Sequence, residues 1–256
     1  MIGVFDSGLG GLKAFHSLCM TFPDEDMLYY ADTAHLPIGV RGEEEIVALV
    51  EDALRFFEEK GARAVLLACG TASAVALEKC KEKFTFPLFG IIEEGARAAC
   101  SVTKSERIAV AATPATIRSH AFAGAIRRRL PNAFVAEHPC PTLVTLAEEE
   151  ARRLYDVEAV CDALTPICKE AVDTLILGCT HFPLLSESIK AVLPTVSLVD
   201  PAKETVAAMA RALPQNKEKR TKGAPCRCFH ATKNPAEFAA RAAAVLGLPL
   251  AARPTK

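Results

Sequence analysis

Two similar stretches constrain most strongly what this chain can fold into. Residues 66–71 read LLACGT and residues 175–180 read LILGCT. In each, an apolar run typical of a buried strand ends in a cysteine, Cys69 or Cys179, and a threonine follows within two positions. Buried strands that lead through a short turn into a helix are the units of parallel α/β folds.

The pattern of strand, turn and helix occurs in two rounds. The first opens with an apolar run at 2–5 and a glycine-rich turn at 6–11, and the second with a run at 108–112 and a turn at 113–116. The separation of Asp6 and Cys69 is close to that of Thr113 and Cys179. This spacing predicts two similar α/β lobes. Ligands of such sheets bind beyond the carboxyl ends of the strands, where these residues fall.

Hydrophobic periodicity predicts the remaining elements. The clearest is a helix over 43–60, with acidic residues in its first turn and a glycine just after its end. Residues 33–42 read as a loop. Further strands are expected at 27–32, 64–68, 88–92, 133–136, 173–177, 196–199 and 226–230, and helices from 12 and 71 and at 117–130, 157–171, 186–192, 201–212 and 235–246.

Composition limits the classes of protein. The 256 residues suffice for one large or two small domains, and the net charge of −1 offers no electrostatic attraction to nucleic acid or an anionic membrane. No apolar run approaches the ~20 residues of a membrane span, and the N-terminus lacks the pattern of a signal peptide. We therefore expect a cytoplasmic protein whose ten cysteines are reduced thiols. Those in apolar helical patterns are expected in the core, namely Cys19, Cys80, Cys100, Cys161 and Cys168.

Cys69 and Cys179 differ from these because each lies between a strand and a helix. The helix macrodipole and its free N–H groups are expected to lower the pKa of such a thiol from ~8.5, so that it can act as a base. A buried core cysteine is the alternative. His181 could assist proton transfer or be structural, and Asp6 could be a cleft carboxylate or could cap the turn that follows it.

Neither a dinucleotide nor a metal is expected. The turn DSGLGG at 6–11 does not match G-x-G-x-x-G, although its glycines would let backbone N–H groups approach a carboxylate. Cys226, Cys228 and His230 lack a second ligand pair at structural-zinc spacing. The basic stretch 217–222 is expected to be a solvated loop.

Four motifs together resemble those of glutamate racemase, in the aspartate/glutamate racemase superfamily. They are DSGLGG at 6–11, ADT at 31–33, ACGTASA at 68–74 and GCTHFPL at 178–184. The resemblance covers nearly the whole chain in matching order. It implies two α/β lobes with pseudo-twofold symmetry and an active site in the cleft between them. We expect residues 1–93 with 206–256 in one lobe, and 94–205 in the other.

The resemblance also implies a reaction. Glutamate would be racemised without a cofactor by two bases, and the D-glutamate would serve peptidoglycan synthesis. One cysteine thiolate removes the α-proton and the other cysteine, as a thiol, protonates the opposite face. By resemblance, Cys69 acts on the D-enantiomer and Cys179 on the L-enantiomer. The expected partner is this small amino acid, and a homodimer is possible.

Further site residues follow from the resemblance alone. Asp6, His181 and Glu148 match auxiliary acid/base positions. The substrate-binding positions are Ser7, Pro37, Ile38, Gly39, Gly70, Thr71, Thr113, Thr116 and Thr180. Between Thr113 and Thr116, the sequence does not decide which contacts the substrate.

The chain departs from the family pattern at three positions. Gly70 replaces the usual asparagine, Ile38 the usual tyrosine, and Thr145 a common proline. The first two changes remove polar groups, which leaves open a related racemase with an altered substrate or weak activity. A non-catalytic binding protein on the same fold is a further alternative, against which the retention of both cysteines, Asp6 and His181 argues.

Overall fold

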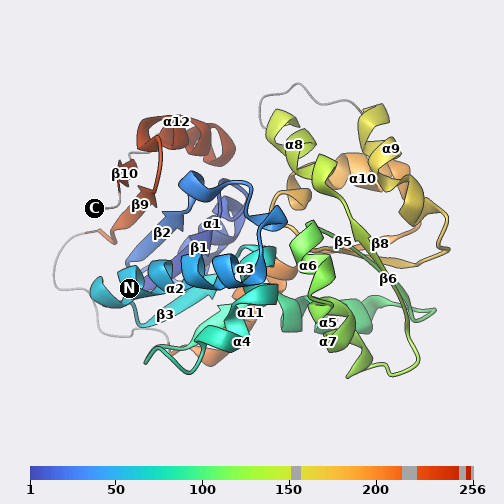
Figure 1. Cartoon of the computed structure of the whole chain (residues 1–256), viewed down its shortest axis with the longest axis horizontal. Helices are drawn as coiled ribbons and strands as arrows, with labels where there is room; N and C mark the ends of the chain where they lie inside the picture. The colour runs from blue at the N-terminus through green and yellow to red at the C-terminus, as the bar shows by residue number, and fades with distance from the viewer. Residues whose placement is uncertain (151–156, 215–223, 248–251, 255–256) are drawn as a thin grey trace.

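The computed structural model describes residues 1–150, 157–214, 224–247 and 252–254. Within these ranges the strands form two sheets, in the orders β10-β9-β2-β1-β3-β4 and β6-β5-β7-β8. All paired strands are parallel. The orders β2-β1-β3-β4 and β6-β5-β7-β8 are equivalent, so the prediction of two similar α/β lobes is confirmed. Figure 1 shows the two sheets side by side with helices around them.

The sheets are built from short buried strands. The first contains β1 (Ile2–Asp6), β2 (Met27–Ala31), β3 (Ala64–Leu67), β4 (Leu88–Gly90), β9 (Arg227–Ala231) and β10 (Ala252–Pro254), and the second β5 (Arg107–Ala112), β6 (Phe134–Pro139), β7 (Thr174–Leu177) and β8 (Ser197–Val199). The central strands β1, β3 and β7 are buried along their whole length. Their continuous apolar runs fit a sheet that is covered on both faces.

The helices cover these faces. They are α1 (Leu12–Thr21), α2 (Glu43–Glu59), α3 (Gly70–Val75), α4 (Leu77–Cys80), α5 (Ile91–Val102), α6 (Pro114–Arg118), α7 (Ala121–Arg127), α8 (Pro141–Glu150), α9 (Val157–Cys168), α10 (Ser186–Val192), α11 (Pro201–Ala212) and α12 (Pro235–Leu246). Short 3₁₀ turns lie at Thr33–His35, Ile38–Val40 and Phe182–Leu185. None of the helices in the described ranges combines the length and apolar character needed to cross a bilayer.

The lobe boundaries stay a prediction. Both predicted boundaries fall within helices, the one between residues 93 and 94 in α5 and the one between residues 205 and 206 in α11. These two helices pack against each other. The last part of the described chain returns to the first sheet, where β9 pairs with β2. Helix α12 packs against α1 (Figure 1).

Several local predictions were wrong. The strand expected over 88–92 ends at Gly90, and Ile91 and Ile92 begin α5, whose buried face they join. The helix expected over 117–130 is divided into α6 and α7 by His120, whose φ of 52° is left-handed. Helix α8 was not anticipated. Short apolar runs do not distinguish a strand from the first turn of a buried helix.

The five cysteines assigned to the core do not all lie there. Cys80 is buried, Cys19 and Cys100 are half-buried, and Cys161 and Cys168 are exposed. The last two lie on α9, which turns Val160, Leu164 and Ile167 inward. Cys161 and Cys168 are seven residues apart and share an exposed side of the helix, beside the buried stripe. The basic stretch 217–222 lies outside the described residues.

Candidate active site

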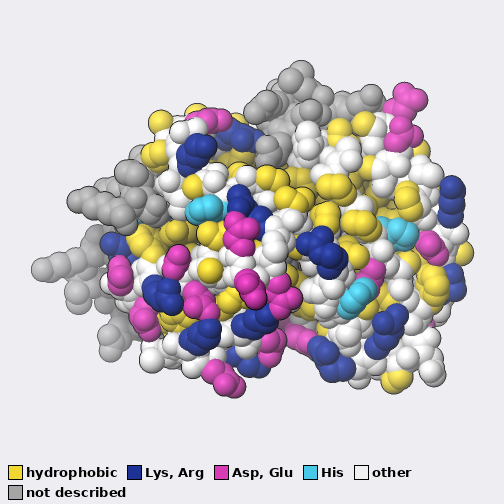
Figure 2. Space-filling model, viewed as in Figure 1, with side chains coloured by type: hydrophobic (Ala, Val, Ile, Leu, Met, Phe, Trp, Pro, Cys, Tyr) yellow, Lys and Arg dark blue, Asp and Glu magenta, His cyan; other side chains and the backbone are white. Residues whose placement is uncertain are grey.

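A cavity of about 430 Å³ opens where the two lobes meet. Hydrophobic side chains follow the line between the lobes on the face that Figure 2 shows. The residues that line the cavity are Ser7, Leu36, Pro37, Ile38, Gly39, Val40, Cys69, Gly70, Thr71, Thr113, Pro114, Pro141, Val144, Thr145, Cys179, Thr180 and His181. Most of the predicted site residues are therefore brought together, and no lysine or arginine is among the described lining residues.

The two cysteines reach this cavity from equivalent places in the two lobes. Cys69 follows β3 and caps the start of α3, and Cys179 follows β7. Their exposed fractions are 4% and 6%. The Sγ of Cys69 lies 3.8 Å from the Oγ of Ser7, and the Sγ of Cys179 lies 3.7 Å from the Nδ1 of His181. Each thiol thus has one polar side chain beside it that can stabilise or exchange its proton.

Asp6 does not line the cavity but lies directly behind it. Its side chain is fully buried. One carboxylate oxygen accepts a hydrogen bond from the N–H of Gly8 (2.9 Å), and the other accepts one from the hydroxyl of Thr180 (3.0 Å). The second bond joins the two lobes. The carboxylate closes its own turn, as the capping alternative expects, and it does not lie in the cleft but holds Thr180, which lines the cavity.

The pKa of Cys69 is raised, whereas the sequence analysis predicted that it would be lowered. Burial, followed by the charge of Asp6, raises the pKa of the Cys69 thiol to about 11. The backbone N–H groups of Ala72 and Thr71 and the hydroxyl of Ser7 act in the other direction. The helix terminus therefore lowers the pKa as expected, but desolvation and a neighbouring carboxylate outweigh it. This environment therefore favours the thiol form of Cys69.

A chain of hydroxyls crosses the cavity wall. The Oγ1 of Thr71 in the first lobe lies 2.8 Å from that of Thr113 in the second, which in turn lies 2.9 Å from the Oγ1 of Thr116. Thr113 lines the cavity, whereas Thr116 is buried behind it. The geometry therefore favours Thr113 as the hydroxyl that faces the cavity and Thr116 as its support.

At Gly70 the backbones of the two lobes lie close together beside the cavity. An ideal Cβ at this position would lie 2.1 Å from the carbonyl oxygen of Gly178. An asparagine, which the family usually has here, does not fit unless the backbones separate. Gly39 is similarly placed, since a Cβ there would lie 2.6 Å from the Cβ of Thr113.

Apolar residues of the wall were missed by sequence reasoning. Leu36 and Val40 flank the predicted loop positions Pro37, Ile38 and Gly39, and the second lobe adds Pro114, Pro141 and Val144. The only sequence signal was their proximity to assigned positions.

Glu148 lies on α8, but its side chain is outside the described residues. In the described part of the chain, no three metal-ligating side chains gather.

Two parallel α/β lobes whose facing strand ends each supply a thiol to one cavity define an enzyme of the racemase class. Residues 11–209 match the family model described as Asp/Glu/Hydantoin racemase. The chain belongs to the Asp/Glu/hydantoin racemase family.

Similar proteins agree with this assignment. A glutamate racemase from Gloeobacter violaceus is 40% identical over 241 residues, which cover 93% of this chain and 89% of the relative. A glutamate racemase from Bacillus anthracis has a solved structure with a TM-score of 0.92 and 34% identity, covering 100% of this chain and 97% of that one. The structure of the Francisella tularensis enzyme in complex with D-glutamate has a TM-score of 0.89 and 30% identity, with coverage of 100% and 97%.

Proposed function

We propose that this chain interconverts L- and D-glutamate by moving the α-proton between two cysteines. The observation that carries the proposal is that Cys69 and Cys179 line one cavity from opposite lobes. Inversion at carbon requires a base on one face and an acid on the other, which one thiol per lobe supplies. The glutamate racemases among the relatives support glutamate as the substrate.

The proton transfer needs help from the cavity. One sulfur, as thiolate, takes the α-proton and becomes a thiol, while the other thiol gives its proton to the opposite face and becomes a thiolate. A proton next to a carboxylate is very weakly acidic, so the developing carbanion must be stabilised by fixed dipoles away from water. In this proposal, the hydroxyls of Thr71 and Thr113 and backbone N–H groups at the strand ends supply these dipoles, while the hydroxyl of Thr180 is bonded to Asp6.

Individual roles complete the proposal. Cys69 acts on D-glutamate and Cys179 on L-glutamate. His181 assists Cys179, which its Nδ1 approaches. Asp6 acts indirectly, by accepting a hydrogen bond from Thr180 and by raising the pKa of Cys69. Glu148 remains a third auxiliary acid or base in this proposal.

The direct test follows the circular dichroism of L- or D-glutamate mixed with the protein. The circular dichroism signal should decay toward zero, the value of the racemic mixture, with either enantiomer. Cys69→Ala and Cys179→Ala should each abolish this decay, whereas Cys161→Ala, at an exposed cysteine on α9, should leave it unchanged. Racemisation by either of the first two variants would rule out the two-base assignment.

A second candidate is a racemase for a related amino acid. It is favoured by the wall itself, where Ile38 and Gly70 present no polar side-chain group to a substrate carboxylate. Incubation of single amino acids in heavy water should reveal the substrate by deuterium at its α-carbon. Exchange confined to an amino acid other than glutamate would favour this candidate. No exchange with any amino acid would favour a non-catalytic binding protein.

The cellular setting belongs to the same proposal. The D-glutamate product would supply peptidoglycan synthesis. Thiols are kept reduced in the cytoplasm, where we place the enzyme, either as a monomer or as a homodimer. Its only proposed ligand is the small amino acid. Nucleic acid is not among its proposed partners.

A further inference from the structure

We propose that Thr232 is a positioning residue of the catalytic cavity. Its hydroxyl, near the end of the described chain, holds the segment 33–41 that forms one cavity wall. This segment is called the strap here. The proposal concerns how the strap is fixed and rests on the proposed function only where it predicts kinetics.

The strap is the part of the wall with least regular structure of its own. It consists of the 3₁₀ turns Thr33–His35 and Ile38–Val40, neither of which has a side-chain cap. Yet Leu36 to Val40 all line the cavity, and Gly39 lies against Thr113 of the second lobe. A segment that makes so few hydrogen bonds within itself must be held in place by its neighbours.

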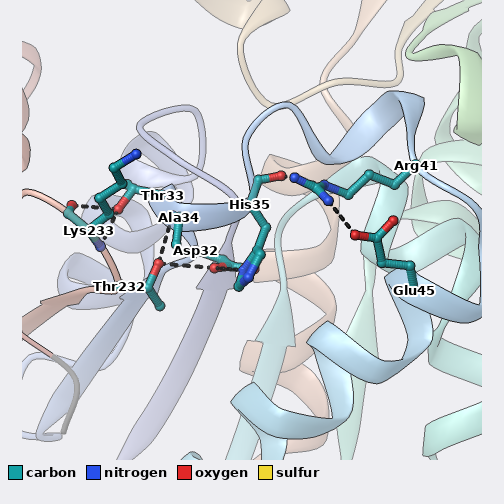
Figure 3. A network of polar contacts seen from close by, with 8 residues as sticks. All are labelled: Asp32, Thr33, Ala34, His35, Arg41, Glu45, Thr232 and Lys233. Atoms are coloured by element: carbon teal, nitrogen blue, oxygen red, sulfur yellow. Dashed lines mark hydrogen bonds and ion pairs between the residues drawn. The ribbon is translucent and has the colours of Figure 1, made fainter.

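Thr232 provides the first anchor. It follows β9, and its backbone N–H donates to the carbonyl of Ala31 (3.0 Å) at the end of β2. Its hydroxyl donates to the Oδ1 of Asp32 (3.0 Å) and accepts a hydrogen bond from the N–H of Ala34 (2.8 Å). Figure 3 shows this hydroxyl bonded both to Asp32, which directly precedes the strap, and to Ala34 within it. One side chain therefore joins the carboxylate and the backbone at the beginning of the strap.

Adjacent bonds strengthen the same connection. Asp32, only 2% exposed, also accepts a hydrogen bond from the Nδ1 of His35 (2.7 Å). The hydroxyl of Thr33 donates to the carbonyl of Lys233 (2.7 Å) and accepts from its N–H (2.9 Å). Figure 3 shows these pairs at the two sides of Thr232. The strap is thus attached to residues 200 positions later in the chain.

The far end of the strap has a second anchor. The Nε of Arg41 donates to the carbonyl of His35 (2.7 Å), and its guanidinium pairs with Glu45 on α2. The carbonyl of Arg41 accepts a hydrogen bond from Arg118 of the second lobe (3.3 Å). With both ends held, the apolar residues between them are fixed over the cavity. Loss of the Thr232 hydroxyl would weaken the attachment of the first end, where the Thr33–Lys233 bonds remain, and would leave a buried carboxylate with fewer partners.

Thr232→Val tests the anchor because it removes the hydroxyl and keeps the shape. Hydrogen exchange should become about tenfold faster across 33–41, above all at the Ala34 amide, as expected from the loss of one charge-assisted hydrogen bond. For racemisation, KM should rise by less than the tenfold change in exchange, with kcat within about twofold, because substrate binds only the fraction of molecules whose strap is in place. Thr232→Ser should restore both values.

The second lobe offers a matched control. The hydroxyl of Thr103 donates to the carboxylate of Asp173 (2.6 Å) at the opposite ends of the strands from the cavity. Thr103→Val should lower thermal stability without changing KM or exchange across the strap. Unchanged exchange in Thr232→Val, or a Thr232→Ser variant as impaired as Thr232→Val, would overturn the proposal. The exchange measurement decides this even if glutamate is not the substrate, so the two proposals fail separately.

Discussion

The Cα of Gly70 lies against the carbonyl oxygen of Gly178, so closely that an ideal Cβ on Gly70 would lie 2.1 Å from that oxygen. The two residues belong to different lobes and each adjoins a cavity cysteine. The contact is between two backbones, which neither a rotamer change nor a shift of a flexible side chain can relieve. Glycine at position 70 thus lets the lobes meet beside the thiols.

Gly70→Ala should therefore impair catalysis although alanine favours a helix. In an open helical position alanine is more stable than glycine by about 0.5–1 kcal/mol. At Gly70 the methyl group must push the lobes apart, and we expect kcat/KM to fall at least about tenfold, since misplacement of catalytic groups by an ångström is costly. The measurement is the racemisation rate together with the melting temperature.

Gly124→Ala is the control for this substitution. It lies within α7, and a Cβ there would meet only the guanidinium of Arg128 at 3.5 Å. This variant should be slightly more stable than the wild type and fully active. If Gly70→Ala behaved in the same way, the contact with Gly178 would not constrain the cavity.

Thr180→Val should weaken catalysis by removing the hydrogen bond between the lobes. The Thr180 hydroxyl donates to the fully buried carboxylate of Asp6 at 3.0 Å. Loss of a hydrogen bond to a buried charged group costs about 1.5–3 kcal/mol. If this whole cost destabilises the catalytically active arrangement of the two lobes, kcat/KM falls roughly 10- to 150-fold. Thr180→Ser should retain most activity, and equal defects in the two variants would contradict this role of the hydroxyl.

Alkylation of Cys69 should depend on pH in a way that reports its neighbours. Burial and then Asp6 raise the pKa of this thiol to about 11, so its thiolate fraction and its reaction with iodoacetamide should increase throughout pH 7–10. Asp6→Asn removes a raising charge and should shift the profile to lower pH. Ser7→Ala removes a hydrogen bond that lowers the pKa and should shift it to higher pH.

Peptide mass spectrometry can follow Cys69 separately from the other nine cysteines. Exposed Cys161 is the internal reference, and its profile should be the same in all variants. Shifts of the two Cys69 profiles in one direction would show that the charge of Asp6 and the hydroxyl of Ser7 do not act as inferred.

Asp173→Asn should destabilise the fold in a pH-dependent manner. Burial tends to raise the pKa of this carboxyl, but hydrogen bonds from Thr103, Lys104, Ser105 and Thr174 hold it well below its usual range. A depressed pKa stabilises the fold above the unfolded value near ~4, and this contribution is lost as the pH falls through the lower folded value.

The expected loss at pH 7 is about 1–2 kcal/mol, since the carboxylate is only partly buried. Urea unfolding at pH 7 and at pH 3 measures it. The difference between variant and wild type should be smaller at pH 3. A constant difference would show that the charge of Asp173 is not responsible.

Much of the architecture was predictable because it depends on local patterns. The apolar runs ending at Asp6, Cys69 and Cys179 predicted strands that the structure confirms, and their order predicted two lobes. The periodicity of α2 also placed its ends within one residue. The failures also concerned short segments. The apolar run at 88–92 fits a strand as well as the start of a helix, and the pattern around His120 gave no sign of its left-handed conformation.

The sequence by itself determined which residue types stand at the ends of which strands, and so the class of chemistry. The tertiary structure decided how these residues act. It placed Thr113 in front of Thr116, brought Gly70 against Gly178, and attached the strap to Thr232. It also reversed the expected pKa shift of Cys69, because burial and Asp6 outweigh the helix terminus. These outcomes depend on distances between segments far apart in the chain, which local periodicity does not encode.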